Sequence, residues 1–478
     1  MRYAMDVTVN IKPVYANIVH SAVWEGPCRC GEAELLEPAN ERRSGRESFL
    51  LWQEELRRNL APCARMLEPV YVEYDETFTV SQKQLERLEA EGNEIDLYLV
   101  RYRVPGIDRL GKPVSMIDTS CTAVDVVAFY HDRGLPAYLT HDFEEYNQLL
   151  AYLQVKKAIA NTKILVLTAG EQVPFAVNSC CTDMRHLTER YGIRSIRLPL
   201  LSVTDYFEEG EDVSEETDRI REKALSCKVP KNWMEQDVRY FHAVRRMMEH
   251  FDCNAFTTAC KEFCATRVPA EYHVVPCLTH CLNKDDRIPS SCEEDINVLM
   301  AMMVFMYLAK KSVFMGNPAL IPAGSQKCGE LGIADMDPER LYDEDLLEIT
   351  HAVPGCKLDG FDAEELPFEI WNFTHEGWGS KVQVNMAQHE ERTVTIGRFS
   401  RSGDRLIVTR GTVTGCRFNE LGCSPSVFYT IKGGPCAFRQ RLAWGGYGHH
   451  LAVIYGDYID QVWELGKIVG FEVERFEG

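Results

Sequence analysis

The segment from residue 163 to residue 201 constrains the fold most, because it has the pattern of a strand, a helix and a second strand. Residues 164–168 form a nearly continuous apolar run, which is typical of a strand buried on both faces. A helical pattern over 182–191 and a second strand pattern over 195–201 follow it. Strands joined by such a crossover lie parallel in one sheet. This segment therefore predicts a parallel sheet covered by helices.

Strand and helix patterns alternate on both sides of this segment, which favours further α/β structure. Before it, we expect helices and strands at 47–60, 81–91, 95–101 and 115–118. After it, charged amphipathic helices are expected at 216–224 and 236–251.

A different pattern begins near residue 313. Short alternating strands, separated by Gly, Asn and Ser, are expected at 382–386, 393–398, 405–412 and 426–431. This spacing is typical of antiparallel β structure. The chain has 478 residues, which is enough for about three domains. We therefore expect an α/β fold class with α/β domains over 1–161 and 162–312, and a β-rich C-terminal domain over 313–478.

The composition argues against several partners. The formal net charge is -20, and nucleic acid or an anionic membrane would repel such a surface. The longest apolar run, residues 298–309, is shorter than the ~20 residues that span a bilayer, so it predicts a buried core helix. The chain opens with a strand pattern rather than a secretory signal, and 18 cysteines in a long chain fit reduced thiols. We expect a cytoplasmic protein that binds neither nucleic acid nor membrane.

The densest acidic group is Glu293-Glu294-Asp295, directly before the apolar run. Ser291 and Glu294 have the spacing of a capping box, and a helix N-terminus stabilises negative charge, so a purely structural role explains these residues. A carboxylate at the end of a strand–helix loop is also well placed to bind a divalent cation. The residues alone leave both interpretations open.

Histidines provide the other candidates for a site. His449 and His450 follow the flexible segment 445–448, and paired histidines after glycines can present imidazole to a metal or a substrate. The alternative is a polar loop with one buried histidine. His351 stands alone before the turn at Pro354, where a histidine is commonly structural.

Other chemistries find little support in the sequence. The pairs Cys260/Cys264 and Cys277/Cys281 are separated by three residues, whereas zinc knuckles prefer two, so we expect no structural zinc there. The chain has no Walker-type phosphate loop and no G-x-S-x-G elbow. Nucleotide-driven chemistry and serine hydrolysis are therefore not indicated.

Three segments, taken together and in order, resemble the L-fucose/L-arabinose isomerase family, and the resemblance covers residues 163–478 best. Cys292-Glu293-Glu294-Asp295 resembles the start of the family's helix that opens with a metal-binding glutamate, which falls on Glu293. Phe314-Met315-Gly316-Asn317-Pro318 resembles the segment that bears the second acidic ligand. Gly448-His449-His450 resembles the metal-binding histidine loop, in which His450 matches the ligand best. His351 stands where the arabinose isomerase branch has another histidine of the site.

The resemblance implies two Rossmann-like α/β domains followed by a β-rich domain, a manganese ion, and a trimer or hexamer with its site between domains and subunits. It also implies an aldose–ketose isomerase that acts on an open-chain sugar through an enediol. Such a reaction needs a base and an acid on neighbouring carbons, and a divalent cation to stabilise the enediolate charge. Carboxylate and imidazole ligands suit manganese. By this resemblance Glu293 is catalytic as well as a ligand, with Asn317 and His450 as further ligands and His351 and His449 as possible metal or substrate contacts.

Asn317 departs from the family pattern. It falls 24 residues after Glu293, where the resemblance leads us to expect Asp or Glu. An amide oxygen can coordinate a hard cation but cannot accept and return a proton. The second proton carrier is therefore open, and the sequence offers Asp295, Asp335, Asp337 and Glu376. Two other functions stay open with it: a sugar-binding or regulatory protein with a degraded metal site, and another metal-assisted sugar enzyme such as an epimerase or lyase.

Overall fold

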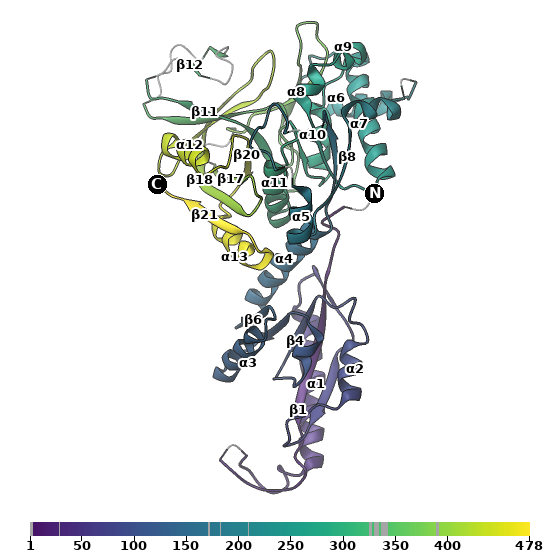
Figure 1. Ribbon diagram of the computed structural model, residues 1–478, viewed down its shortest axis with the longest axis vertical. Helices are drawn as coiled ribbons and strands as arrows, with labels where there is room; N and C mark the ends of the chain where they lie inside the picture. Colours follow the sequence, from purple (N-terminus) through teal and green to yellow (C-terminus); the bar gives the residue numbers. More distant parts are fainter. Residues whose placement is uncertain are drawn as a thin grey trace. The chain divides into compact units, whose positions relative to one another are not determined.

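The computed structural model describes residues 3–27, 29–170, 173–181, 183–208, 210–324, 327–328, 334–335, 343–388 and 392–478. The chain divides into two compact units (Figure 1). The N-terminal unit is Val7–Gln154, and the main unit is Met1–Asp6 together with Val155–Gly478. Residues 162–312 and 313–478, which the sequence assigns to separate domains, thus share the main unit, and the division into three domains stays a prediction.

The N-terminal unit is built on one parallel sheet of six strands. Its order is β2-β1-β4-β5-β6, and β3 also pairs with β1. The strands are β1 Val9–Ile18, β2 Ala64–Met66, β3 Val70–Tyr74, β4 Leu97–Val100, β5 Val114–Ile117 and β6 Ala137–Thr140. The helices are α1 Pro38–Asn59, α2 Gln82–Glu89, η1 Ile107–Leu110, α3 Cys121–Asp132 and α4 Phe143–Ala160, whose last residues belong to the main unit. All four residues of β4 are buried, as the apolar pattern predicts.

The main unit contains a second parallel sheet, of order β10-β9-β7-β8. The strands are β7 Lys163–Thr168, β8 Arg194–Pro199, β9 Ala255–Thr258 and β10 Ser290–Ser291. The helices around it are α5 Met184–Tyr191, η2 Leu200–Tyr206, α6 Ser214–Lys223, α7 Lys231–His250, α8 Cys260–Cys264, α9 Val268–Tyr272 and α10 Cys277–Asp285. The strand–helix–strand unit predicted between residues 163 and 201 is confirmed, with β7 at the centre of the pairing.

The C-terminal part of the main unit is β-rich, and six of its strands close into an antiparallel barrel. Around the barrel these are β17 Thr393–Phe399, β20 Leu451–Tyr455, β11 Phe314–Ile321, β14 Leu346–Thr350, β19 Ser426–Ile431 and β18 Arg405–Arg417, which returns to β17. β21 Glu472–Phe476 extends β18 in parallel. The strand expected at 382–386 lies outside the barrel, in a two-stranded ribbon of β15 Phe368–Asn372 and β16 Ser380–Val384. The remaining elements are β12 Lys327–Cys328, β13 Ala334–Asp335, α12 Pro435–Trp444 and α13 Ile459–Val469.

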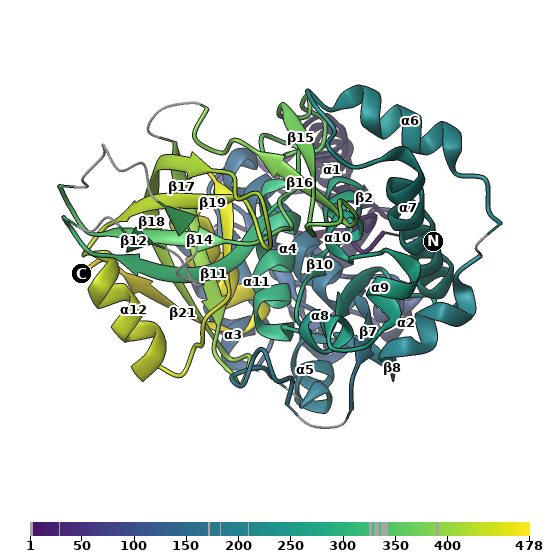
Figure 2. The same cartoon turned by 90° about the horizontal axis from the view of Figure 1, so that it is seen from above.

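Helix α11, Ile296–Ala309, lies between the barrel and the parallel sheet (Figure 2). It packs against β17 and β20 of the barrel and against β10 of the sheet. Residues 296–307 are all buried, which explains why this helix is apolar around its whole circumference. No helix among the described residues has both the length and the apolar character needed to cross a bilayer.

Candidate metal centre

The start of α11 differs from the capping box predicted at Ser291 and Glu294. Ser291 belongs to strand β10, and the helix begins at Ile296. Its N-cap is Asp295, whose Oδ1 accepts the N–H groups of Asn297 and Val298 at 3.0 and 3.1 Å. The capping-box interpretation is therefore wrong, because Ser291 pairs in β10 and three residues separate it from the N-cap of the helix. Glu293 and Glu294 therefore lie in the loop before the helix rather than in its first turn.

Both glutamates of this loop have a left-handed backbone, with φ of 58° at Glu293 and 53° at Glu294. Such a residue, when it is not glycine, costs about 1–3 kcal/mol, and this strain concentrates at functional sites. Two contacts of Glu294 hold the loop in place. Its N–H donates to the Thr258 carbonyl at 2.9 Å, and its carboxylate lies 2.5 Å from the Arg197 guanidinium. The loop is thus fixed at Glu294, and Glu293 is the residue that it presents.

Glu293 meets two histidines from the barrel. Its Oε2 lies 3.4 Å from His450 Nε2, and its Oε1 lies 3.6 Å from His351 Nε2. One ligand atom of each residue lies within 4.8 Å of the other two. Both imidazoles are buried, and the Glu293 side chain is 17% exposed. Neither Nε2 atom has a hydrogen-bond partner among the described residues. Three of the five residues that the sequence singles out therefore form one compact group.

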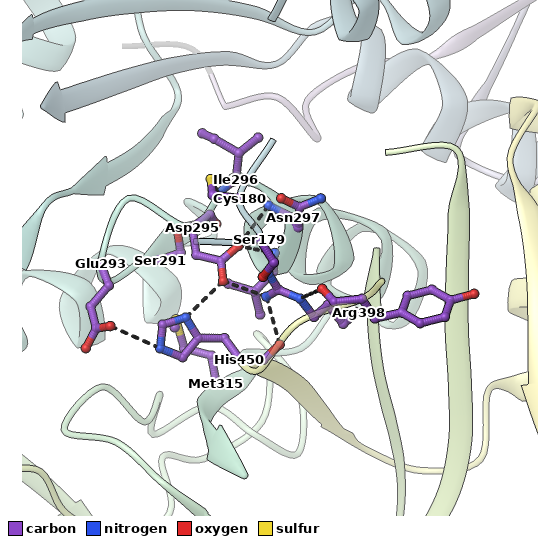
Figure 3. Close-up of polar contacts among 12 residues, drawn as sticks. Ser179, Cys180, Ser291, Glu293, Asp295, Ile296, Asn297, Met315, Arg398 and His450 are labelled. Atoms are coloured by element: carbon purple, nitrogen blue, oxygen red, sulfur yellow. Dashed lines mark hydrogen bonds and ion pairs between the residues drawn. The ribbon is translucent and has the colours of Figure 1, made fainter. Parts of the chain in front are cut away.

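His450 is held by a buried ionic network (Figure 3). Its Nδ1 lies 2.9 Å from Asp295 Oδ2, and the same oxygen lies 2.5 Å from Arg398 Nη1. Asp295 and Arg398 are both completely buried. The carboxylate accepts a hydrogen bond from the Nδ1–H of the imidazole, so the neutral ring keeps its free lone pair on Nε2. His450 is therefore oriented as a ligand, with Nε2 directed at Glu293.

The network keeps its carboxylates ionised. Burial raises the pKa of Asp295, but the Arg398 guanidinium and His450 lower it by more, so that the pKa lies well below its usual range. Burial also raises the pKa of Glu293, yet the nearby His351 and His450 imidazoles bring it down to about 2. Both groups are therefore anionic at neutral pH, as a hard divalent cation requires of its carboxylate ligand.

His351 is arranged differently from His450. Its Nδ1 accepts the N–H of Ala352 at 3.0 Å, which places the proton of the neutral ring on Nε2, facing Glu293. In this tautomer the Nε2–H of His351 faces the Glu293 carboxylate, but the two atoms are 3.6 Å apart, which is too far for a hydrogen bond. To act as a metal ligand through Nε2, it has to move the proton to Nδ1 and release the Ala352 contact.

Asn317 lies on the side of β11 that faces the Glu293 loop. It lies in β11, is buried, and pairs with Thr350, the residue before His351. Met315 precedes it by two residues and so shares its side of the strand. The Met315 sulfur lies 3.3 Å from the Cys292 nitrogen, directly before Glu293. The Asn317 Oδ1 has no hydrogen-bond partner among the described residues. Its role as a ligand stays a prediction.

His449 lies outside the group of three. Its ring centroid is 4.3 Å from that of His450, and burial together with the charges of His450 and Arg398 lowers its pKa to about 4. It is therefore neutral at physiological pH, and its ring packs against that of His450.

The four carboxylates considered as second proton carriers have different surroundings. Asp295 is occupied by Arg398, His450 and the start of α11. Glu376 is exposed and accepts the Trp378 indole N–H at 2.9 Å. The Asp335 side chain and Asp337 lie outside the described residues. None of these observations supplies a second free carboxylate beside Glu293.

Cysteines also gather beside this loop. The neighbouring Cys264 thiol lowers the pKa of Cys260, but the Cys292 thiol and burial raise it well above its usual value. Among the described residues, the ligand atoms of Glu293, His351 and His450 are the only set of three that lie within 4.8 Å of one another, and the thiols form no such group.

Two buried charged residues on the strands around this group escaped prediction from the sequence. Arg398 is a completely buried cation, and Glu348 is a buried carboxylate on the strand that leads to His351. Their positions depend on which barrel strands are neighbours, and no local pattern encodes this. No known family profile matches the chain, and no curated protein matches it. The interpretation of the site therefore depends on its geometry and on the three resembling segments.

Proposed function

We propose that the chain is a metal-dependent aldose–ketose isomerase related to the L-fucose/L-arabinose isomerases. The observation that carries the proposal is the buried group of Glu293, His351 and His450. The resemblance names these residues from motifs far apart in the sequence, and their ligand atoms lie within 4.8 Å of one another. If the resemblance were accidental, there would be no reason for these three residues to lie together in the structure.

The donor set supports a hard or borderline divalent cation, and we propose Mn²⁺. One carboxylate and two imidazoles are suitable ligands for it. The thiol of the adjacent Cys292, in contrast, stays protonated, because the Cys260 thiol lowers its pKa but burial and the Glu293 charge raise it, to about 12. Glu293 and His450 would hold the ion, with His351 and the Asn317 amide oxygen as further ligands. When bound, the cation would stabilise the negative charge of an enediolate. Asp295 keeps the His450 lone pair directed into the site.

The unpaired polar atoms support a sugar as the substrate. Asn317 Oδ1 and His450 Nε2 are buried acceptors without donors among the described residues. A buried acceptor left unpaired costs about 1–3 kcal/mol, so the site favours a guest that brings donors. A cation and the hydroxyl groups of a polyol provide them.

Assembly, location and the finer description of the fold follow the same resemblance. We propose a cytoplasmic trimer or hexamer in which the two parallel sheets represent Rossmann-like domains. Closed symmetry is the usual arrangement of homo-oligomers. Light scattering at micromolar concentration tests the assembly, and a monomer would contradict it.

The function is tested by loading the purified protein with Mn²⁺ and incubating it with a panel of aldoses. We expect tight binding of one ion per chain by electron paramagnetic resonance, and a ketose from at least one aldose. Absence of both metal binding and ketose formation refutes the proposal. Asn317 cannot carry a proton, and this favours one alternative, a sugar-binding or regulatory protein. In that case the chain would bind the aldose without converting it. Products other than ketoses would identify an epimerase or lyase.

A further inference from the structure

Glu348 is a buried carboxylate that the fold does not satisfy. It lies in β14 and is 1% exposed. Its Oε1 accepts the Thr350 hydroxyl at 3.1 Å, and Thr350 Oγ1 lies 2.7 Å from Ser426 Oγ. Its Oε2 has no hydrogen-bond partner among the described residues. Burying a carboxylate is costly unless it is paired and fully hydrogen-bonded, so an unpaired oxygen here requires an explanation.

The strand register places Glu348 on the same side of the barrel wall as Asn317. Asn317 is directly opposite Thr350, and residues opposite each other in an antiparallel pair share a face. Glu348 precedes Thr350 by two residues, so it shares that face as well. Asn317 and Met315 share a face for the same reason, and the Met315 sulfur contacts the Cys292 nitrogen beside Glu293. Glu348 thus belongs to the face of the barrel that is turned toward the Glu293 loop.

The ladder also places His450 beside Asn317. Met315 pairs with Ala452, and Gly316 pairs with Leu451, so the continuation of β20 brings His450 level with Asn317. Glu348, Asn317 and His450 therefore follow one another across neighbouring strands. Each has a buried polar atom without a partner among the described residues: Oε2, Oδ1 and Nε2, respectively. All three are acceptors, since Asp295 directs the His450 proton to Nδ1.

We propose that Glu348 is the second carboxylate of the site and carries the proton that Asn317 cannot. This assignment rests on the proposed isomerase function. The carboxylate removes the proton from C2 of the open-chain aldose, and the C–H electron pair forms the C1=C2 bond as the C1 carbonyl oxygen gains the charge. The proton of the C2 hydroxyl passes to that oxygen. Glu348 then returns its proton to C1 as the C2 carbonyl forms, so no oxidant or reductant is needed.

A first test is independent of turnover and uses the metal-free protein. In Glu348→Gln the amide oxygen can still accept the Thr350 hydroxyl. The neutral amide NH₂ group takes the place of Oε2, which has no partner among the described residues and lies on the same face as the acceptors Asn317 Oδ1 and His450 Nε2. The melting temperature should stay the same or rise by about 2 °C. If the Glu348 carboxylate merely stabilises the barrel, the melting temperature of Glu348→Gln should fall. A fall of more than about 2 °C overturns the proposal.

A second test measures turnover by the manganese-loaded protein. Glu348→Gln should lower kcat by about 10²–10⁴-fold, as expected for loss of a general base, while its Mn²⁺ affinity changes by less than about tenfold. The exposed Glu344 provides the matched control, and Glu344→Gln should behave as the wild type. Moving the carboxylate across the strand pair, in Asn317→Asp/Glu348→Gln, should recover at least about tenfold of the lost rate.

The outcomes separate the two proposals. A wild type that converts no aldose refutes the isomerase function and the role of Glu348 together. An active wild type whose rate is unaffected by Glu348→Gln leaves the isomerase in place and overturns Glu348 alone. A loss of rate that Asn317→Asp does not restore also counts against a movable carboxylate and overturns the assignment.

Discussion

Asp295→Asn is the substitution that tests the ionic network most directly. Asparagine has nearly the same shape and is as good an N-cap as aspartate, so the start of α11 is retained. The change removes only the negative charge between Arg398 and His450. Arg398 is then a completely buried cation without a counter-ion, although it still donates to the carbonyls of Tyr447 and His450.

The expected loss of stability follows from these distances and from burial. Asp295 Oδ2 lies 2.5 Å from Arg398 Nη1, and both side chains are 0% exposed. Removing one partner of such a buried pair costs about 3–5 kcal/mol, because the other charge stays buried and unpaired. For a unit of this size the melting temperature should fall on the order of 10 °C. The melting temperature of Asp295→Ala should fall further, since this variant also loses the helix N-cap, which contributes about 1 kcal/mol.

The same substitution should weaken metal binding. Without the carboxylate, the His450 proton is no longer held on Nδ1, and the ring loses its fixed orientation toward Glu293. Substituting a residue that orients a metal ligand typically costs 10–100-fold in affinity, so the Mn²⁺ dissociation constant should rise by about that factor. The measurement is calorimetric titration at a temperature where the variant is folded, as judged by circular dichroism.

Arg398→Met supplies the control that closes a thermodynamic cycle. If the charge pair causes the loss, the double variant should be more stable than the two single losses predict, by about 1–3 kcal/mol. Melting of Asp295→Asn within about 2 °C of the wild type, together with an Mn²⁺ affinity within about threefold, would refute the reasoning. Strict additivity in the cycle would refute the coupling.

Three further substitutions and conditions have defined outcomes. Glu293→Gln should lower Mn²⁺ affinity at least about 100-fold, because it removes the only anionic ligand of the group; equilibrium dialysis that finds unchanged metal content contradicts this. Asn317→Asp adds a charge and should tighten Mn²⁺ binding, whereas equal affinity in calorimetry means that residue 317 is not a ligand position. The pKa of Glu293 is lowered to about 2 in the folded chain, so its stabilising contribution is complete above its unfolded pKa of about 4.3 and is lost as the pH falls toward 2. Metal-free wild type should therefore lose more melting temperature between pH 6 and pH 3 than Glu293→Gln, and parallel pH profiles would contradict the lowered pKa.

Much of the α/β part of the fold could be predicted from the sequence, because its signals are local. β7 is apolar and buried over its four central residues, 164–167, and α11 is a long apolar run of helical length. The closed barrel could not be predicted in this way. Its closure depends on the pairing of β17 with β18 and with β20, and strand alternation alone does not specify register between distant segments.

The candidate site divides along the same line. The sequence analysis singles out Glu293, His351 and His450, and the structure brings them together. Glu348 stands in no motif, since its only sequence signal is one acidic residue in the strand pattern of residues 346–350. Its relation to Asn317 depends on the register of two antiparallel strands. Motif spacing identifies residues at expected positions along the chain, but it does not encode which residues the pairing of two distant strands brings together.

The backbone of the Glu293 loop shows how the fold holds the site before any ligand arrives. Two successive left-handed glutamates cost about 1–3 kcal/mol each, and a free loop would relax. The Thr258 carbonyl and Arg197 prevent this by holding Glu294, and the Asp295 side chain caps the helix that follows. Since Asp295 also orients His450, one residue links the loop, the helix and the barrel. The carboxylate of Glu293 and the lone pair of His450 are therefore positioned by the same set of contacts, which reduces the conformational cost of binding a cation between them.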